Sequence, residues 1–145
     1  MSEVVKGGGQ AARLLMRDRE SLARAVTEAL YAEAGDRLAR HGPNGRVRCL
    51  EDMHFNIEHL IPAVDLGEPQ LFATYVRWLD SLLRARNVPT REVVRCLELV
   101  EAEARARFAA DEAEAVADVL RVGLAALPAK AGTAEAGTNE SEGAS

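Results

Sequence analysis

The spacing of the apolar residues is the feature that most constrains what this chain can fold into. Apolar side chains recur three and four positions apart through most of its 145 residues, which is the period of one face of an α-helix. No segment alternates apolar and polar residues over the length of a strand, and Ile57 and Ile61 are the only isoleucines. Ala, Leu, Arg and Glu dominate instead, and these residues favour helices. The sequence therefore predicts an all-α fold.

Glycines and changes of composition divide the chain into three parts. Residues 1–9 include three consecutive glycines, and we expect a flexible lead there. Residues 129–145 are mostly Ala, Gly, Thr, Ser and Glu, which cannot bury enough apolar surface to fold, so this stretch is expected to be a disordered tail. Residues 10–128 are expected to form one helical bundle domain.

Five main helices are expected in this domain, and their short connections require them to pack as neighbours around one core. The first should run from about Ala11 to Glu33 and end at Gly35. The second should begin near Arg46, and Pro62 should kink or end it because a proline ring clashes with the preceding turn. The remaining three are expected over about 69–86, 90–109 and 111–128, and the inner face of the last comprises Val116, Leu120, Gly123 and Leu127.

The charge balance excludes several classes of partner. The chain carries 18 basic and 23 acidic residues and a net charge of -5, so it has no overall positive field, and no local basic stripe suggests nucleic-acid binding. Charged residues interrupt every long apolar stretch, and the start lacks the apolar core of a secretory signal. We therefore expect no membrane span and a cytoplasmic location. Cys49 and Cys96 lie among apolar neighbours without a CxxC motif, which is typical of reduced, buried thiols.

His54 interrupts an otherwise apolar row of the second expected helix. That row comprises Val47, Leu50, His54, Ile57, Ile61 and Val64. An unpaired buried polar group costs about 1–3 kcal/mol, so we expect a carboxylate, with Glu51 and Glu58 within reach, or a backbone carbonyl to bond the imidazole. The alternative functions are a ligand to a metal or tetrapyrrole and a pH-sensitive switch.

Motifs for metal binding and catalysis are incomplete. Glu51 and His54 have the Glu-x-x-His spacing of di-iron bundles, but the sequence offers no second pair, and His59 faces roughly 140 degrees away from His54. There is no Gly-x-Ser-x-Gly turn, no Ser-His-Asp order and no phosphate-binding loop. We assign no metal ligands and no catalytic residues, and an enzyme is the minority interpretation.

Three of the six aromatic residues, Phe72, Tyr75 and Trp78, fall within seven positions. Such a group can wall a flat cofactor, anchor a partner protein or form the core of a bundle that has few aromatic residues. Together with His54, these residues are the candidates for lining a cofactor pocket.

The stretch from residue 48 to residue 100 resembles a known family. The resemblance rests on Cys49-x-x-Asp52, Leu60, and then Leu71-Phe72-x-x-Tyr75-Val76-x-Trp78-Leu79-x-x-Leu82-Leu83-x-x-Arg86-x-Val88-Pro89. It is similar to the helical regions that precede B12-binding domains in bacterial cobalamin-dependent regulators, and more loosely to globin-like sensor domains of bacterial signalling proteins. The resemblance implies a helical, globin-like fold and a sensory or regulatory role. It does not extend to cobalamin, because Asn56 stands near where those relatives often carry a His, and the Asp-x-His-x-x-Gly loop is absent from this sequence.

Two functions follow as hypotheses. The first is a soluble regulatory or sensory domain that acts through contact with a protein partner, as a homodimer, with the helix that carries Phe72, Tyr75 and Trp78 near the interface. The second is a globin-like carrier of haem or another tetrapyrrole, with His54 or His59 as the iron ligand.

Overall fold

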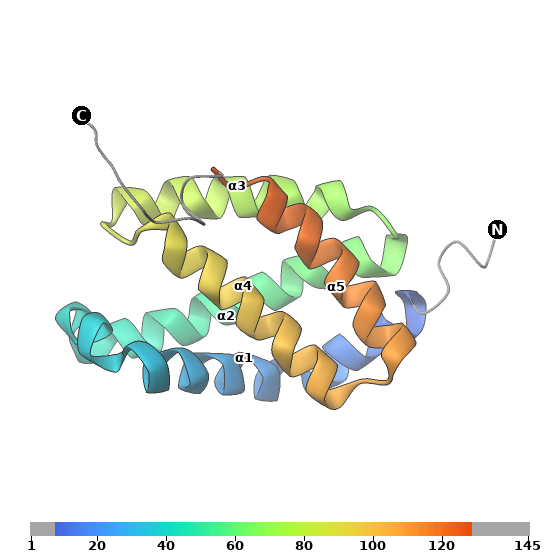
Figure 1. The fold of residues 1–145 in the computed structure, drawn as a ribbon, viewed down its shortest axis with the longest axis horizontal. Helices are drawn as coiled ribbons and strands as arrows, with labels where there is room; N and C mark the ends of the chain where they lie inside the picture. The colour runs from blue at the N-terminus through green and yellow to red at the C-terminus, as the bar shows by residue number, and fades with distance from the viewer. Residues whose placement is uncertain (1–7, 129–145) are drawn as a thin grey trace.

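The computed structural model describes residues 8–128, and this part of the chain consists of helices and short connections without a strand. The elements are α1 (Gly8–Leu38), the 3-10 turn η2 (Ala39–His41), α2 (Pro43–Leu66), α3 (Pro69–Ala85), α4 (Thr90–Arg107) and α5 (Ala110–Ala125). The predicted all-α bundle of five main helices is confirmed (Figure 1). Residues 1–7 of the expected lead and all of the expected tail over 129–145 lie outside the described residues.

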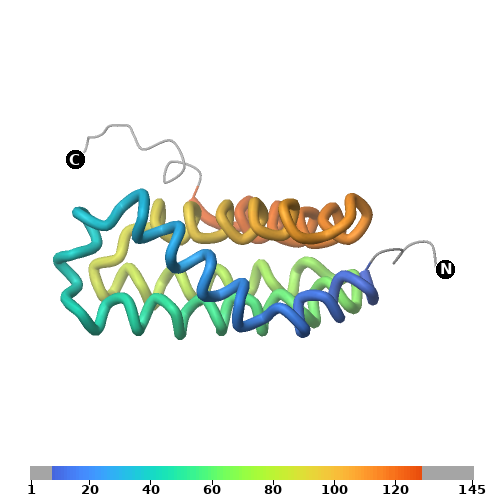
Figure 2. Tube along the Cα trace, turned by 90° about the horizontal axis from the view of Figure 1, so that it is seen from below, coloured from blue at the N-terminus to red at the C-terminus, as the bar shows by residue number. Residues whose placement is uncertain are grey.

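The helices form two layers. In Figure 2, α4 and α5 lie side by side in one layer, and α2 and α3 lie in the other. Helix α1 begins at the end of the bundle near the α2–α3 connection and crosses obliquely to the other end, where η2 leads back into α2. The core between the layers is built from the apolar stripe of each helix, as amphipathic helices require.

Two boundaries of α1 differ from the prediction. The helix begins at Gly8 rather than Ala11, so the last two residues of the expected lead are helical. It does not end at Gly35 but continues to Leu38, with a distortion at Ala34 where φ is -131° and ψ is 22°. Ala34 and Leu38 are both buried in the core, and such tertiary packing outweighs the weak helix propensity of one glycine.

Helix α2 also extends further than predicted. It begins at Pro43 rather than Arg46 and passes through Pro62 to Leu66, so Pro62 does not end it. The helix ends at Gly67, whose φ of 64° lies in the left-handed region that favours glycine.

The buried row of α2 is rotated by about one position from the predicted row. Val47 is exposed, and Leu50, His54 and Ile61 are half-buried. The residues that face the core are Met53, Asn56, Ile57, Leu60, Ala63 and Val64. The prediction was right only for Ile57 and Val64, because both faces of α2 carry apolar residues.

Helices α3 and α5 pack closely at Gly123, where α5 has no side chain. The predicted inner face of α5 is buried throughout, at Val116, Leu120, Gly123 and Leu127. A Cβ atom at Gly123 would lie 2.7 Å from Cδ2 of Phe72 and 3.3 Å from Cγ2 of Val76. The glycine therefore allows α3 to approach α5 at this point.

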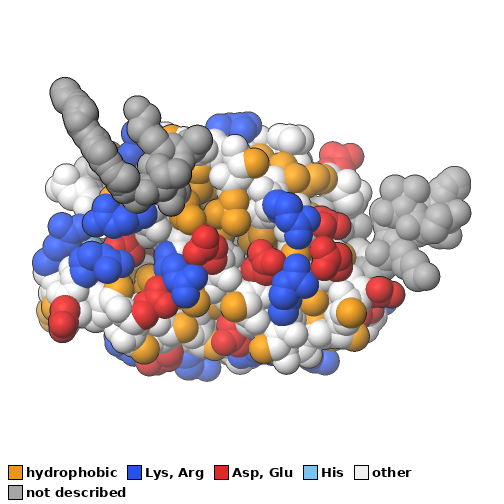
Figure 3. Space-filling model, in the orientation of Figure 1, with side chains coloured by type: hydrophobic (Ala, Val, Ile, Leu, Met, Phe, Trp, Pro, Cys, Tyr) orange, Lys and Arg blue, Asp and Glu red, His pale blue; other side chains and the backbone are white. Residues whose placement is uncertain are grey.

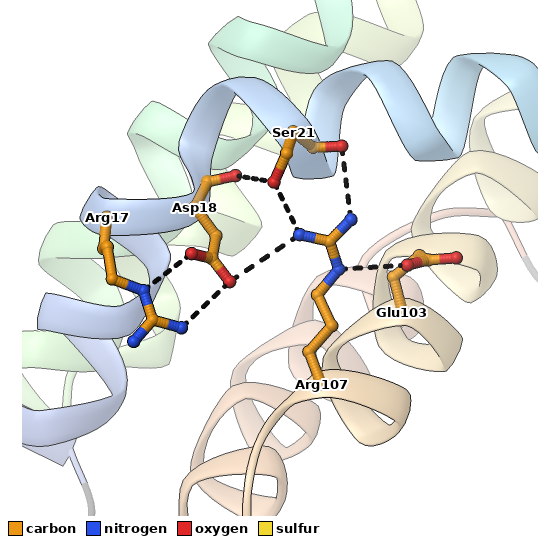
Figure 4. Close-up of polar contacts among 5 residues, drawn as sticks. All are labelled: Arg17, Asp18, Ser21, Glu103 and Arg107. Carbon is orange, nitrogen blue, oxygen red and sulfur yellow. Dashed lines mark hydrogen bonds and ion pairs between the residues drawn. The ribbon is translucent and has the colours of Figure 1, made fainter.

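A charged cluster joins α1 to the end of α4 (Figure 4). Arg107 donates hydrogen bonds to Oγ of Ser21 at 2.6 Å and to Oε1 of Glu103 at 3.2 Å. Its guanidinium also lies 3.6 Å from the carboxylate of Asp18, which pairs with Arg17 at 2.7 Å. Ion pairs of this exposed kind contribute little stability individually, but here they connect two elements that are distant in the sequence.

Candidate functional site

A cavity of about 130 Å³ lies at one end of the bundle. Four elements converge there: the end of α1 with η2, the start of α2, the end of α3 and the start of α4. This is the left-hand end in Figure 1, where η2 and the connection between α3 and α4 lie. The lining residues are Leu30, Tyr31, Leu38, His41, Gly45, Arg48, Cys49, Asp52, Met53, Asn56, Leu79, Leu83, Arg86, Val88, Glu92, Val93 and Cys96.

Apolar side chains form most of this lining. Leu30, Leu38, Met53, Leu79 and Val93 are all buried core residues that also face the cavity. An engineered apolar cavity of about 150 Å³ in another protein takes up a benzene ring. The cavity described here therefore has room for a molecule of about one ring.

Glu92 is the charged group set into this apolar wall. It lies in the first turn of α4 and is 5% exposed. Its Oε2 accepts a hydrogen bond from Nε of Arg37 at 2.7 Å, and the helix N-terminus also favours a negative charge there. Its Oε1 is buried and has no hydrogen-bond partner among the described residues. A buried acceptor without a donor costs free energy, so this oxygen is a polar group that the fold itself leaves unsatisfied.

Two free thiols belong to the lining of the cavity. Cys49 belongs to α2 and Cys96 to α4. Burial raises the pKa of the Cys49 thiol to about 11 and raises the pKa of Cys96 well above its ordinary value. Both side chains are therefore protonated near neutral pH, and the thiolate needed for nucleophilic chemistry is scarce. They act as small apolar parts of the wall.

The other charged residues of the lining are Arg48, Asp52 and Arg86, and Tyr31, His41 and Asn56 are its uncharged polar side chains. The two arginines are exposed, whereas Asp52 is half-buried. Burial raises the pKa of the Asp52 carboxyl, and the positive charge of Arg86 opposes this effect. With Glu92 included, the lining carries two arginines and two carboxylates, so the site does not select strongly for an ion of either sign.

The four residues predicted to line a pocket lie elsewhere. His54 is half-buried, and Trp78 is 57% exposed. Phe72 is fully buried against α5, and Tyr75 is buried between α3 and α2. None of the four lines the cavity.

Three of these residues nevertheless form a cluster centred on Tyr75. The rings of Phe72 and Trp78 lie 5.9 Å and 6.0 Å from the ring of Tyr75. The imidazole of His59 also stacks on Tyr75, with 4.0 Å between centroids and 8° between planes. The Tyr75 hydroxyl donates a hydrogen bond to Oδ1 of Asn56 at 2.5 Å. Because Asn56 lines the cavity, Tyr75 connects the aromatic cluster with the cavity wall.

The histidines expected as iron ligands do not face the cavity. Neither His54 nor His59 belongs to its lining, and Nδ1 of His59 lies 2.9 Å from the carbonyl oxygen of Phe55. Between residues 8 and 128, the structure contains no group of three or more His, Cys, Asp or Glu side chains that could hold a metal ion. The cavity therefore offers no support for the tetrapyrrole hypothesis, which stays a prediction.

The sequence analysis missed Glu92 and the role of Asn56. Glu92 stands at a helix start, where an acidic residue is common, and Asn56 lies on the row next to the one chosen for α2. The sequence does place four residues of the cavity lining near the starts of two helices: Cys49 and Asp52 in α2, and Glu92 and Cys96 in α4. Nothing in their spacing shows that these two helix starts meet.

Comparison with protein-family models, with curated proteins and with solved structures finds no match for this chain. Within the described residues, none of the helices combines the length and the apolar character that crossing a membrane requires.

Proposed function

We propose that this chain is a regulatory or sensory helical domain of the cytoplasm that acts through protein–protein contact, with a second copy of itself as the partner. The observation that carries the proposal is a row of large apolar side chains exposed along the outer face of α2 and α3. Phe55 is 53% exposed and Trp78 is 57% exposed, and Leu66 and Leu71 of the same two helices are exposed as well. Large apolar groups that stay in contact with water along one face are typical of an interaction site.

Helical spacing places these residues on one strip. Phe55, His59 and Leu66 follow one another on α2 at intervals of four and seven, so they share a face of that helix. Leu71 and Trp78 lie seven positions apart on α3 in the same way. The stacked rings of His59 and Tyr75 mark where the two helices meet. We call Phe55, His59, Leu66, Leu71 and Trp78 the aromatic strip.

The arrangement of the aromatic strip on two adjacent helices favours a second copy of this chain as the partner. Most homodimers are two-fold symmetric and use the same surface on both subunits. A pair of adjacent helices with apolar residues at matching spacing can pack against an identical pair to give four helices in one interface. Aromatic side chains are also enriched at the centres of such interfaces.

The opposite side of the molecule is less suited to contact. Acidic and basic side chains alternate over α4 and α5 (Figure 3). Glu114 accepts hydrogen bonds there from Arg105 and Arg121, and Arg121 also pairs with Asp118 at 2.7 Å. Removing such pairs from water carries a penalty that their attraction does not readily recover. The outer face of α2 and α3 is therefore the better surface for pairing.

The bond between Asn56 and Tyr75 supports a sensory role. Asn56 belongs to the cavity wall, and Tyr75 packs against His59 and Trp78 of the aromatic strip. An occupant of the cavity that changes the position of Asn56 would change the surface presented to a partner. The resemblance to helical domains of bacterial regulators agrees with such a role.

Sedimentation velocity combined with light scattering tests the proposal. We expect a particle of twice the 15.7 kDa chain mass, and we expect the substitutions Phe55→Asp and Trp78→Asp to convert it to a monomer. Met16→Asp and Val47→Asp are matched controls, because both residues are comparably exposed but lie off the strip. A monomeric wild-type protein across the accessible concentrations would refute the proposal, as would equal dissociation by the control variants.

A further inference from the structure

We infer that residues 35–42 form a lid, which pivots at Ala34 and Gly42 and opens the cavity to molecules from solvent. The lid consists of the last turn of α1, the turn η2 and Gly42. It supplies Leu38 and His41 to the wall of the cavity, so its movement removes that part of the wall. This inference concerns access to the cavity and does not depend on dimer formation.

The backbone departs from regular helical geometry at both ends of the lid. At Ala34, φ of -131° and ψ of 22° interrupt α1. The next residue is Gly35, and no atom lies within 4 Å of the position that its Cβ would take, so the space around it is open. At the other end, Gly42 has φ of 74°, in the left-handed region that favours glycine. A segment between two such positions can move as a unit while the helices on either side stay in place.

One apolar side chain and two arginines hold the lid closed. Leu38 is the only fully buried residue of the lid. Nε of Arg37 donates a hydrogen bond to Oε2 of Glu92 at 2.7 Å, and Nη2 of Arg40 donates one to the carbonyl oxygen of Asn87 at 3.2 Å. These interactions are much weaker in sum than the packing of a whole helix. The lid therefore belongs to the part of the fold that opens without global unfolding.

The carboxylate of Glu92 makes the closed state less favourable. While the lid is closed, Arg37 bonds Oε2, but Oε1 is buried without a hydrogen-bond partner among the described residues. Such an acceptor costs free energy that contact with water removes. Because Arg37 moves with the lid, opening lets water reach this carboxylate. The closed state carries a cost that the open state does not, and this brings the two states closer in free energy.

Relaxation-dispersion NMR on the full chain tests the lid, because lids open on the microsecond-to-millisecond timescale. We expect exchange at the amides of residues 35–42 and in the cavity wall that the lid covers, but not along α5. Arg37→Gln removes the charged hydrogen bond and should raise the open population about tenfold. Arg95→Gln is the matched control, because Arg95 pairs with Glu33 and Glu98 outside the lid, and it should leave the open population unchanged.

A second pair of variants tests the pivot. Gly35→Ala restricts the backbone there and should lower the open population about threefold. Gly9→Ala is its control on the same helix, since a Cβ at Gly9 also has no atom within 4 Å and Gly9 lies at the other end of α1. This control should leave exchange in the lid unchanged.

Labelling of Cys49 and Cys96 by a small thiol reagent gives an independent readout, because both thiols belong to the cavity wall. The labelling rate should follow the open population across the variants. It should change little with urea below the unfolding transition, since opening of the lid exposes little surface.

The inference is overturned if residues 35–42 show no exchange, if exchange extends over the whole chain, or if either variant behaves as its control does. A labelling rate that rises with urea as steeply as global unfolding would also overturn it. Trp78→Asp leaves the lid intact, so repeating the NMR measurement on this variant separates the motion of the lid from exchange caused by dimerisation.

Discussion

The close approach of Phe72 to Gly123 leads to a quantitative prediction about stability. Replacing glycine by alanine inside a helix is worth about 1 kcal/mol in helix propensity. At Gly123 the new Cβ would lie 2.7 Å and 2.9 Å from two ring carbons of Phe72, so the core must shift, and overpacking of this kind costs about 1–3 kcal/mol. At Gly35 no atom lies within 4 Å of the new Cβ. The propensity gain is common to both sites, so the difference between the two variants isolates the packing cost.

We therefore expect Gly35→Ala to raise the free energy of unfolding by about 0.5–1 kcal/mol and Gly123→Ala to lower it by about 1 kcal/mol. Urea denaturation followed by circular dichroism measures both changes as shifts of the midpoint at constant slope. A double-mutant cycle adds a second test. Phe72→Leu removes the ring atoms that clash, so Gly123→Ala should be less harmful in that background. Equal stability of the two alanine variants, or strict additivity in the cycle, would refute this account of the α3–α5 contact.

Two further predictions concern titratable groups. Hydrogen bonds from neighbouring arginines lower the pKa values of Asp18, Glu33 and Glu114 below the ordinary values of 3.8 for Asp and 4.5 for Glu. The ionised carboxylates therefore stabilise the folded state above those ordinary values, and this contribution is lost as the pH falls through the lower pKa values of the folded state. The urea midpoint should therefore be steady near neutral pH and fall below about pH 4, and a midpoint that rises on acidification would contradict this assignment. Burial raises the pKa values of Cys49 and Cys96, so a disulfide reagent should label both thiols slowly at pH 8 in the native protein and rapidly in urea. Rapid labelling of the folded chain would show that these thiols are accessible.

The helical architecture could be predicted because the apolar period is strong and the connections are short. The inner face of α5 is the clearest case, since every residue predicted for it is buried, although Ala113, Ala117 and Val119 are buried as well. The boundaries were less accurate. Gly35 and Pro62 are both weak points of a helix in isolation, yet both lie inside long helices here. Burial of their neighbours compensates for the local cost, and sequence patterns do not include that contribution.

The inner row of α2 could not be predicted, because the helix is apolar on two sides. Val47 and His54 belong to a regular helical row, but Met53 and Asn56 belong to another, and only the second faces the core. Trp78, which the sequence left as a candidate for a cofactor wall, a partner anchor or the core, is 57% exposed. Both results have one cause. The outer face of α2 and α3 carries apolar side chains that the fold of a single chain does not bury.

The features that the sequence did not predict, the inner row of α2 and the exposure of Trp78, lie on the two helices that carry the proposed interaction surface. In a chain that only had to fold, polar groups would be satisfied and large apolar groups buried, so departures from these rules indicate places where another requirement acts. Here the departures include the unpaired oxygens of Glu92 and Asp80 and the exposed side chains of Phe55 and Trp78, and Met16 and Val47 are exposed to a similar degree elsewhere. Asn56 lies between the cavity and the aromatic strip, because it lines the cavity and holds the hydroxyl of Tyr75. Burying the polar side chain of Asn56 costs free energy unless it forms hydrogen bonds. The Tyr75 hydroxyl donates one to it, and this bond holds in place the Tyr75 ring, against which His59 and Trp78 of the aromatic strip pack. The same residue that the helical pattern passed over is therefore the one that joins the cavity to the surface.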